Sequence, residues 1–100
     1  MVPIKENWTE LTGTIAMLRA SESRPGFLEL HLQVEAAVPV PGFADFLSDR
    51  VGSTILINVR KEPLEARKAI PGARVRVRVR RGRHADDLFA HTEHLKIDGA

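Results

Sequence analysis

Residues 73–84, ARVRVRVRRGRH, have the types and spacing that point most directly to chemistry. On a strand, successive side chains point to opposite faces, so the valines would be buried and the arginines would share one exposed face. Neighbouring arginines would lie about 6.6 Å apart, a spacing comparable with that of successive phosphates in a nucleic-acid strand. Guanidinium groups bind phosphate through two hydrogen bonds and stack on bases, so the pattern indicates a surface for a polyanion.

The expected polyanion site combines this row with flanking cations and one aromatic side chain. The row and the loop after it supply Arg76, Arg78, Arg80, Arg81 and Arg83, the flanking charge comes from Arg60, Lys68 and Arg74, and Trp8 offers a stacking surface. Residues 60–84 carry ten of the fifteen Lys and Arg but only two of the thirteen acids, a net +8 against −6 elsewhere. Such a concentrated positive surface attracts polyanions although the total charge is only +2.

A second interpretation of the arginine row stays open. Outward strand positions must be polar, and arginine pairs well with carboxylates across a sheet. Asp86, Asp87 and Glu93 follow closely enough to neutralise part of the row, and Glu10 would also do so if the first strand lay beside the arginine strand. In that case the row would be a solvated, internally paired face.

Other reactive residues do not form a recognisable site. His91 and His94 are the closest pair of histidines, but a separation of three on a strand puts them on opposite faces unless a bulge intervenes. We therefore expect no metal and no cofactor. No nucleophile elbow or phosphate-cradling glycine loop is present, which argues against an enzyme. The absence of cysteine excludes disulfides and thiolate sites.

Five segments have the pattern of strands. They cover residues 9–18, 27–38, 53–61, 74–80 and 87–97, and the second alternates most regularly. A helical turn is expected within 42–52, where Phe43, Phe46, Leu47 and Val51 have helical spacing, and a short helix within 63–70. The inward set of the last strand stays open between Leu88, Ala90 and Thr92, or Phe89, His91 and Leu95, or a bulge that switches faces.

This order of elements resembles the OB-fold, a five-stranded Greek-key barrel. The likeness is carried by Leu11, Gly13 and Ile15, by the Pro71–Gly72 step before the arginine strand, and by the closing segment 89–97. It covers roughly residues 8–97 and implies one all-β domain over residues 1–100, with the first strand beside the fourth. A small barrel of the SH3 type is the alternative architecture.

The OB resemblance also contains an argument against a nucleic-acid ligand. OB-folds usually bind across their second and third strands, where aromatic residues stack on bases. Here the outward positions of the second strand are the weakly acidic set Glu29, His31, Gln33 and Glu35, which would repel phosphates. The strand-four row and the loop after it would have to carry the binding instead.

Two functions follow from these observations. The first is a nucleic-acid-binding module that contacts the phosphate backbone of single-stranded DNA or RNA through the arginine strand. The second is a protein-interaction or assembly module without nucleic-acid binding, because residues 36–47 are more apolar than a solvent loop needs; they would otherwise close one end of the barrel. No apolar run is long enough for a membrane span or a signal peptide, so we expect a cytoplasmic protein.

Overall fold

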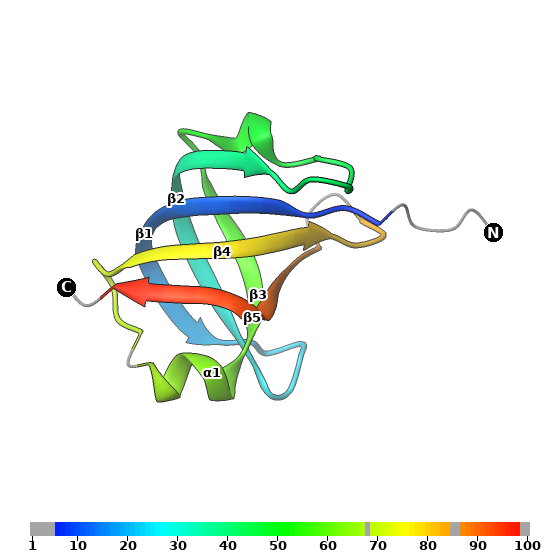
Figure 1. Cartoon of the computed structure of the whole chain (residues 1–100). Helices are drawn as coiled ribbons and strands as arrows, with labels where there is room; N and C mark the ends of the chain where they lie inside the picture. Colours follow the sequence, from blue (N-terminus) through cyan, green and yellow to red (C-terminus); the bar gives the residue numbers. More distant parts are fainter. Residues whose placement is uncertain (1–5, 68, 85–86, 99–100) are drawn as a thin grey trace.

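Five strands form one mixed sheet that closes into a ring (Figure 1). The computed structural model describes residues 6–67, 69–84 and 87–98. Its strands are β1 (Thr9–Ala20), β2 (Phe27–Pro39), β3 (Thr54–Arg60), β4 (Arg74–Arg81) and β5 (Leu88–Asp98). They neighbour one another in the order β1-β2-β3-β5-β4, and β4 pairs back onto β1. The expected all-β class and the expected contact between the first and fourth strands are therefore confirmed.

Alternation along the strands builds the interior of the ring. Val75, Val77 and Val79 are each at most 1% exposed, and the same holds for Leu30 and Leu32 in β2. These residues belong to one apolar cluster that includes side chains from all five strands. Because every second residue faces this cluster, the arginines between the valines of β4 are directed to the outside.

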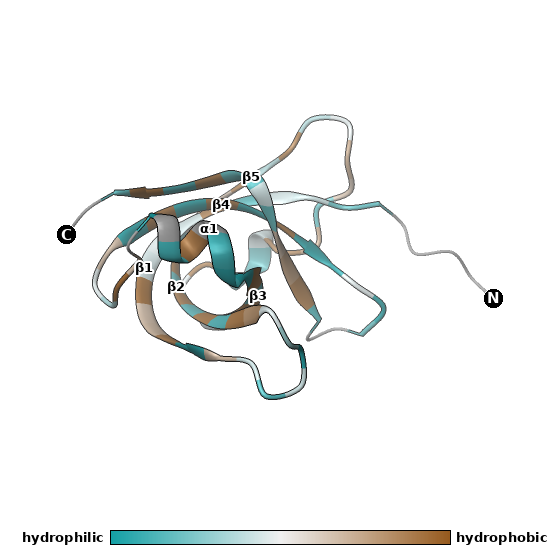
Figure 2. Ribbon diagram, turned by 90° about the horizontal axis from the view of Figure 1, so that it is seen from below, coloured by the Kyte–Doolittle hydropathy of each residue, from teal (hydrophilic) through white to brown (hydrophobic). Residues whose placement is uncertain are grey.

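The helix α1 (Lys61–Ala66) lies over one end of the ring (Figure 2). Its Leu64 is buried in the central cluster and closes that end. The helix was expected at 63–70, so it begins two residues before the expected start and ends four residues before the expected end. Among the described residues, no helix is long and apolar enough to cross a membrane.

The connection between β2 and β3 lies at the other end, where the expected helical turn is reduced to the 3₁₀ turn η1 (Ser48–Arg50) (Figure 1). Leu47 is fully buried there, but Phe43 and Val51 are 39% and 49% exposed. The predicted apolar helix face over 42–52 was therefore wrong for these two residues. A short 3₁₀ turn cannot bring side chains so far apart in sequence onto one face.

Asp45 replaces the missing helix as the organiser of this connection. It accepts hydrogen bonds from the hydroxyl of Thr9 (2.6 Å), from the backbone N–H groups of Leu47 and Ser48 (both 3.1 Å) and from the Ser48 hydroxyl. The two hydroxyl bonds, from Ser48 and then Thr9, lower the pKa of Asp45. The start of β1 is thereby tied to the β2–β3 connection.

A bulge in β5 resolves the ambiguous inward set of that strand. Leu88 and Leu95 are both 2% exposed although they are seven positions apart, an odd number, so the alternation of β5 must change phase between them. The register against β4 shifts at the same place, because Val79 pairs with Ala90 and Val77 with Leu95. The third possibility, a bulge that switches faces, is therefore correct.

Candidate nucleic-acid interface

The outer face of β1, β4 and β5 carries most of the predicted arginine row. Arg76 pairs in register with Thr12 of β1 on one side and with Lys96 of β5 on the other. Arg74 lies between Thr14 and Asp98 one rung along, and Arg78 lies opposite Glu10. The cations of β4 thus form the centre line of a three-stranded face. The residues beside them on β1 and β5 are mostly short or charged.

Two adjoining depressions follow this centre line. The first, of about 230 Å³, is lined by Glu10, Arg76, Arg78, Glu93, His94 and Lys96. The second, of about 240 Å³, is lined by Thr12, Arg74, Val75, Arg76, Lys96 and Asp98. Because Arg76 and Lys96 border both, these two cations stand where the depressions meet. We call the two together the β4 groove.

The protein's own acids occupy part of the row. Arg74 forms an ion pair with Glu35 of β2 at 3.1 Å, and Arg78 forms a longer one with Glu10 at 3.8 Å. No carboxylate among the described residues forms an ion pair with Arg76 or Lys96. The internally paired interpretation therefore applies to Arg74 and partly to Arg78, but not to the middle of the β4 groove.

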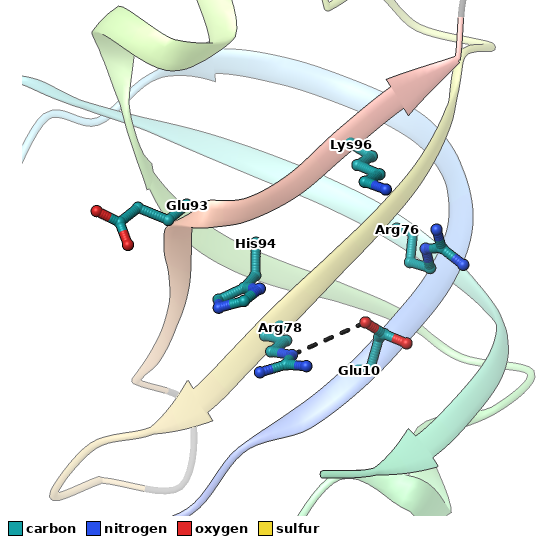
Figure 3. A pocket seen from close by; sticks show the side chains of 6 residues that line it. All are labelled: Glu10, Arg76, Arg78, Glu93, His94 and Lys96. Atoms are coloured by element: carbon teal, nitrogen blue, oxygen red, sulfur yellow. Dashed lines mark ion pairs between the residues drawn. The ribbon is translucent and has the colours of Figure 1, made fainter.

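Arg78 also carries a hydrogen-bond donor with no acceptor. Its Nε atom is buried and makes no hydrogen bond among the described residues, because Glu10 lies too far away at 3.8 Å. A buried donor without an acceptor costs free energy relative to one that is satisfied. In Figure 3, Arg78 and Glu10 face each other, while Glu93 points away from the cations. Glu10 is thus the one acidic group that competes for Arg78 within the first depression.

The remaining predicted arginines are placed against phenylalanine rings. The guanidinium of Arg80 lies 4.9 Å from the centroid of Phe89, and that of Arg60 lies 5.5 Å from Phe27. Arg81 follows Arg80 directly, so it leaves the outward row, and its guanidinium lies 4.5 Å from the ring of Phe46. Arg83 is exposed in the β4–β5 loop, and Lys68 lies outside the described residues.

The acids expected to neutralise the row have different roles. Asp87 pairs with Arg24 of the β1–β2 turn at 3.4 Å rather than with a β4 arginine. Arg24 also lies 4.9 Å from the Phe89 ring, so the β1–β2 and β4–β5 loops meet at this ring. Asp86 lies outside the described residues. Of the described acids that were expected to neutralise the row, only Glu10 forms an ion pair with one of its arginines, Arg78.

Trp8 lies directly before β1, and its ring centroid is 5.1 Å from that of His91 in β5. Asn7 exchanges two hydrogen bonds with the backbone of Arg81, at 2.8 and 3.0 Å, and Thr9 bonds to Asp45. The backbone N–H of Trp8 donates to the backbone carbonyl of Ala44 at 3.1 Å. The backbone that carries the indole is therefore held by hydrogen bonds at Asn7, Trp8 and Thr9.

His94 and Lys96 line the β4 groove, but sequence reasoning did not include them in the site. Their outward direction depends on the β5 bulge, which the letters DLFAHTEHLKI allowed but did not select. The bulge also places the rings of His91 and His94 4.6 Å apart, on one face after all. Even so, no group of three or more metal-ligating side chains is found among the described residues.

Two acids on the outer face of β2 are paired with the protein's own arginines. Glu29 pairs with Arg19 of β1 at 2.7 Å, and Glu35 pairs with Arg74. The Nε2 atom of His31 is buried without a hydrogen-bond partner among the described residues. Among the described residues, the cations without a carboxylate partner that line a depression lie on β4 and β5 rather than on β2.

One part of the apolar segment 36–47 is buried against the ring, and another part is exposed. Val40 and Leu47 are buried and help to close the ring. Val38 and Phe43 remain 56% and 39% exposed. Val38 lies opposite Glu10 across β1 and β2, so an apolar border adjoins the β4 groove.

Comparison with models of known protein families, with curated proteins and with solved structures gives no match for this chain.

Proposed function

We propose that this chain is an OB-type barrel module that binds nucleic acid through its phosphate backbone along the β4 groove. The observation that carries the proposal is the pair of adjacent cations Arg76 and Lys96, which face each other without a carboxylate partner among the described residues. Arg78 adds a third positive group to the same depression. A phosphate there would offset the repulsion between the cations.

The energetics of the sheet support this interpretation. Like charges directly opposite each other on neighbouring strands destabilise a sheet, whereas opposite charges stabilise it. The neighbouring pair of the same two strands is Arg74 with Asp98, so β5 already places an acid opposite one arginine of β4. Keeping Lys96 opposite Arg76 therefore has a cost in folding that an anionic ligand would offset.

The stacked arginines remain available to a ligand. A guanidinium lying over an aromatic ring uses its flat face, while its N–H donors lie in the plane of the group and point outward from its edge. Arg80 over Phe89 is in this state at one end of the outward row. Stacking thus holds the guanidinium in place without consuming the donors that would bind phosphate.

Charge reversal in the β4 groove tests the proposal. The double variant Arg76→Glu with Lys96→Glu should abolish binding of a fluorescent ten-nucleotide single strand at low salt. The matched control is Lys61→Glu with Arg67→Glu, which makes the same change in net charge at exposed positions in and just after α1. The control should keep its affinity within about threefold, because it alters only the long-range field. Equal losses in both variants would argue for unspecific attraction.

The salt dependence of binding provides a second measure. Each phosphate contact to a single strand contributes a slope of roughly −0.7 in log affinity against log salt. Replacing Arg76 and Lys96 with glutamine should therefore reduce the slope by about 1.4 in magnitude. An unchanged slope would show that the ligand neutralises other groups.

A protein-interaction or assembly module is the second candidate function, favoured by the exposure of Phe43 and of Val38, which lies opposite Glu10 at the border of the β4 groove. In that case the chain would form a salt-stable complex that is lost on Phe43→Asp, measured by light scattering. Absence of oligonucleotide affinity together with such a complex would favour this function over the first.

A further inference from the structure

Three aromatic side chains form a continuous run across the outer face beside the β4 groove. The ring centroids of Trp8 and His91 are 5.1 Å apart, and those of His91 and His94 are 4.6 Å apart. Both distances fall at the close end of the range for interacting aromatic pairs. Trp8 comes from the residue before β1 and the histidines come from β5, so the run joins the two strands that flank β4.

The run ends inside the site of positive charge. His94 is exposed and lines the first depression together with Arg76, Arg78 and Lys96. In Figure 3, its ring extends from β5 toward Arg78. A flat exposed ring and three cations therefore border the same depression. A nucleotide carries the matching groups, because its base can stack on the ring and its phosphate can bind the cations.

The size of the depression favours one unit of a polymer over a free small molecule. Its volume of about 230 Å³ is below the roughly 300–1,000 Å³ of pockets that enclose small ligands. The second depression continues from it past Arg76 and Lys96, so a chain could proceed along β4. Repeated shallow contacts of this kind suit a strand in which each unit carries one phosphate and one base.

We infer that His94, supported by His91 and Trp8, is a stacking platform for one unpaired nucleobase whose phosphate lies among Arg76, Arg78 and Lys96. This inference rests on the proposed function and narrows it to single-stranded nucleic acid. In a duplex the bases are stacked on one another and cannot reach the platform. A polyanion without bases, such as polyphosphate, would use the cations alone.

Trp8 makes the inference directly measurable because it is the single tryptophan of the chain. A ten-nucleotide thymidine strand should quench or shift Trp8 emission, whereas a strand of the same length with abasic sites should bind more weakly and leave the emission nearly unchanged. Stacking on one aromatic side chain corresponds to an affinity difference of about tenfold. Polyphosphate and a ten-base-pair duplex should resemble the abasic strand.

Substitution of the platform separates stacking from charge. His94→Ala should remove the difference in affinity between the thymidine and abasic strands, and His94→Phe should retain it, because only the second keeps a flat ring. Neither variant carries a charge at this position, so a charge effect would alter both equally. Thermal unfolding of the two variants verifies that both are folded.

The outcomes distinguish the inference from the proposed function. Equal affinity for thymidine and abasic strands, with binding still abolished by Arg76→Glu and Lys96→Glu, would overturn the platform and leave backbone binding intact. Tighter binding of the duplex than of the single strand would also overturn it. Absence of binding to every polyanion at low salt would remove the proposed function and the platform together.

Discussion

Lys96 lies directly opposite Arg76 across β4 and β5, with no acid of the described structure paired to either. This arrangement predicts opposite effects on folding and on binding for one substitution. Lys96→Glu should raise the free energy of unfolding by about 0.5 kcal/mol, because a cross-strand ion pair replaces a repulsion. The same change should weaken oligonucleotide binding strongly. Urea unfolding and fluorescence titration measure the two effects, and a loss of stability would contradict the argument.

If the β4 groove binds nucleic acid as proposed, Glu10 competes with the ligand for Arg78, and its removal should strengthen binding. Glu10→Gln keeps the shape of the side chain and removes the negative charge 3.8 Å from the guanidinium. We expect a several-fold gain in affinity for single-stranded oligonucleotides and a change in the free energy of unfolding below about 1 kcal/mol, since both side chains are partly exposed. Glu22→Gln, an exposed change in the β1–β2 turn, is the control. Weaker binding by Glu10→Gln would show that Glu10 assists the ligand.

Gly13 is required by close packing between β1 and β2. A Cβ atom at this position would overlap the carbonyl oxygen of Gln33, a backbone atom that cannot move aside alone. Gly13→Ala should therefore lower the free energy of unfolding by about 3 kcal/mol. At Gly82 the nearest atom to an added Cβ is a ring carbon of Phe89 at 3.2 Å, which has more freedom to shift. Gly82→Ala should cost clearly less in urea unfolding, and equal losses would contradict this explanation.

Asp45 should make stability depend on pH in the acid range. Its pKa is lowered in the folded chain by hydrogen bonds from Ser48 and Thr9. The stability it contributes is therefore complete above the unfolded value of about 3.9 and is lost as the pH falls through the lower folded value. Asp45→Asn should be less stable by about 1 kcal/mol at pH 7.

A series of urea unfolding curves from pH 7 to pH 2 measures this effect. The gap between the original chain and Asp45→Asn should narrow as the pH falls. The control is Asp49→Asn, because Asp49 is exposed in η1 and its one ion pair with a described residue is with the adjacent Arg50, at 3.7 Å. A gap for Asp45→Asn that stays constant down to pH 2 would contradict the assigned role.

Much of the fold could be predicted because period-two alternation is a local signal. The valines of β4 and the leucines of β2 face inward as their spacing requires, and this fixes the outward direction of Arg74, Arg76 and Arg78. The helix boundaries were less predictable. The 42–52 segment is organised by Asp45 and its bond to Thr9, a residue 36 positions away, and no local pattern contains that contact.

The state of each arginine could not be predicted because it depends on strands that are distant in sequence. Glu35 reaches Arg74 from β2 although β1 lies between their strands, and the Thr14 hydroxyl of β1 donates to the same carboxylate at 3.2 Å. The contributions of Lys96 and His94 depend on the phase change in β5. Registers between strands, rather than the alternation within each, decide which cations remain available.

The bulge in β5 separates the choice of outward side chains from the packing of the interior, which a regular strand would link. In a strand with uniform alternation, inserting or deleting one residue moves every following side chain of that strand to the opposite face. The outer surface therefore cannot change in this way without disturbing the interior. Here the irregular stretch 91–94 absorbs such a change while Leu88 and Leu95 keep the interior sealed. A change of length in this stretch would therefore alter the outward side chains of β5 and leave the interior sealed.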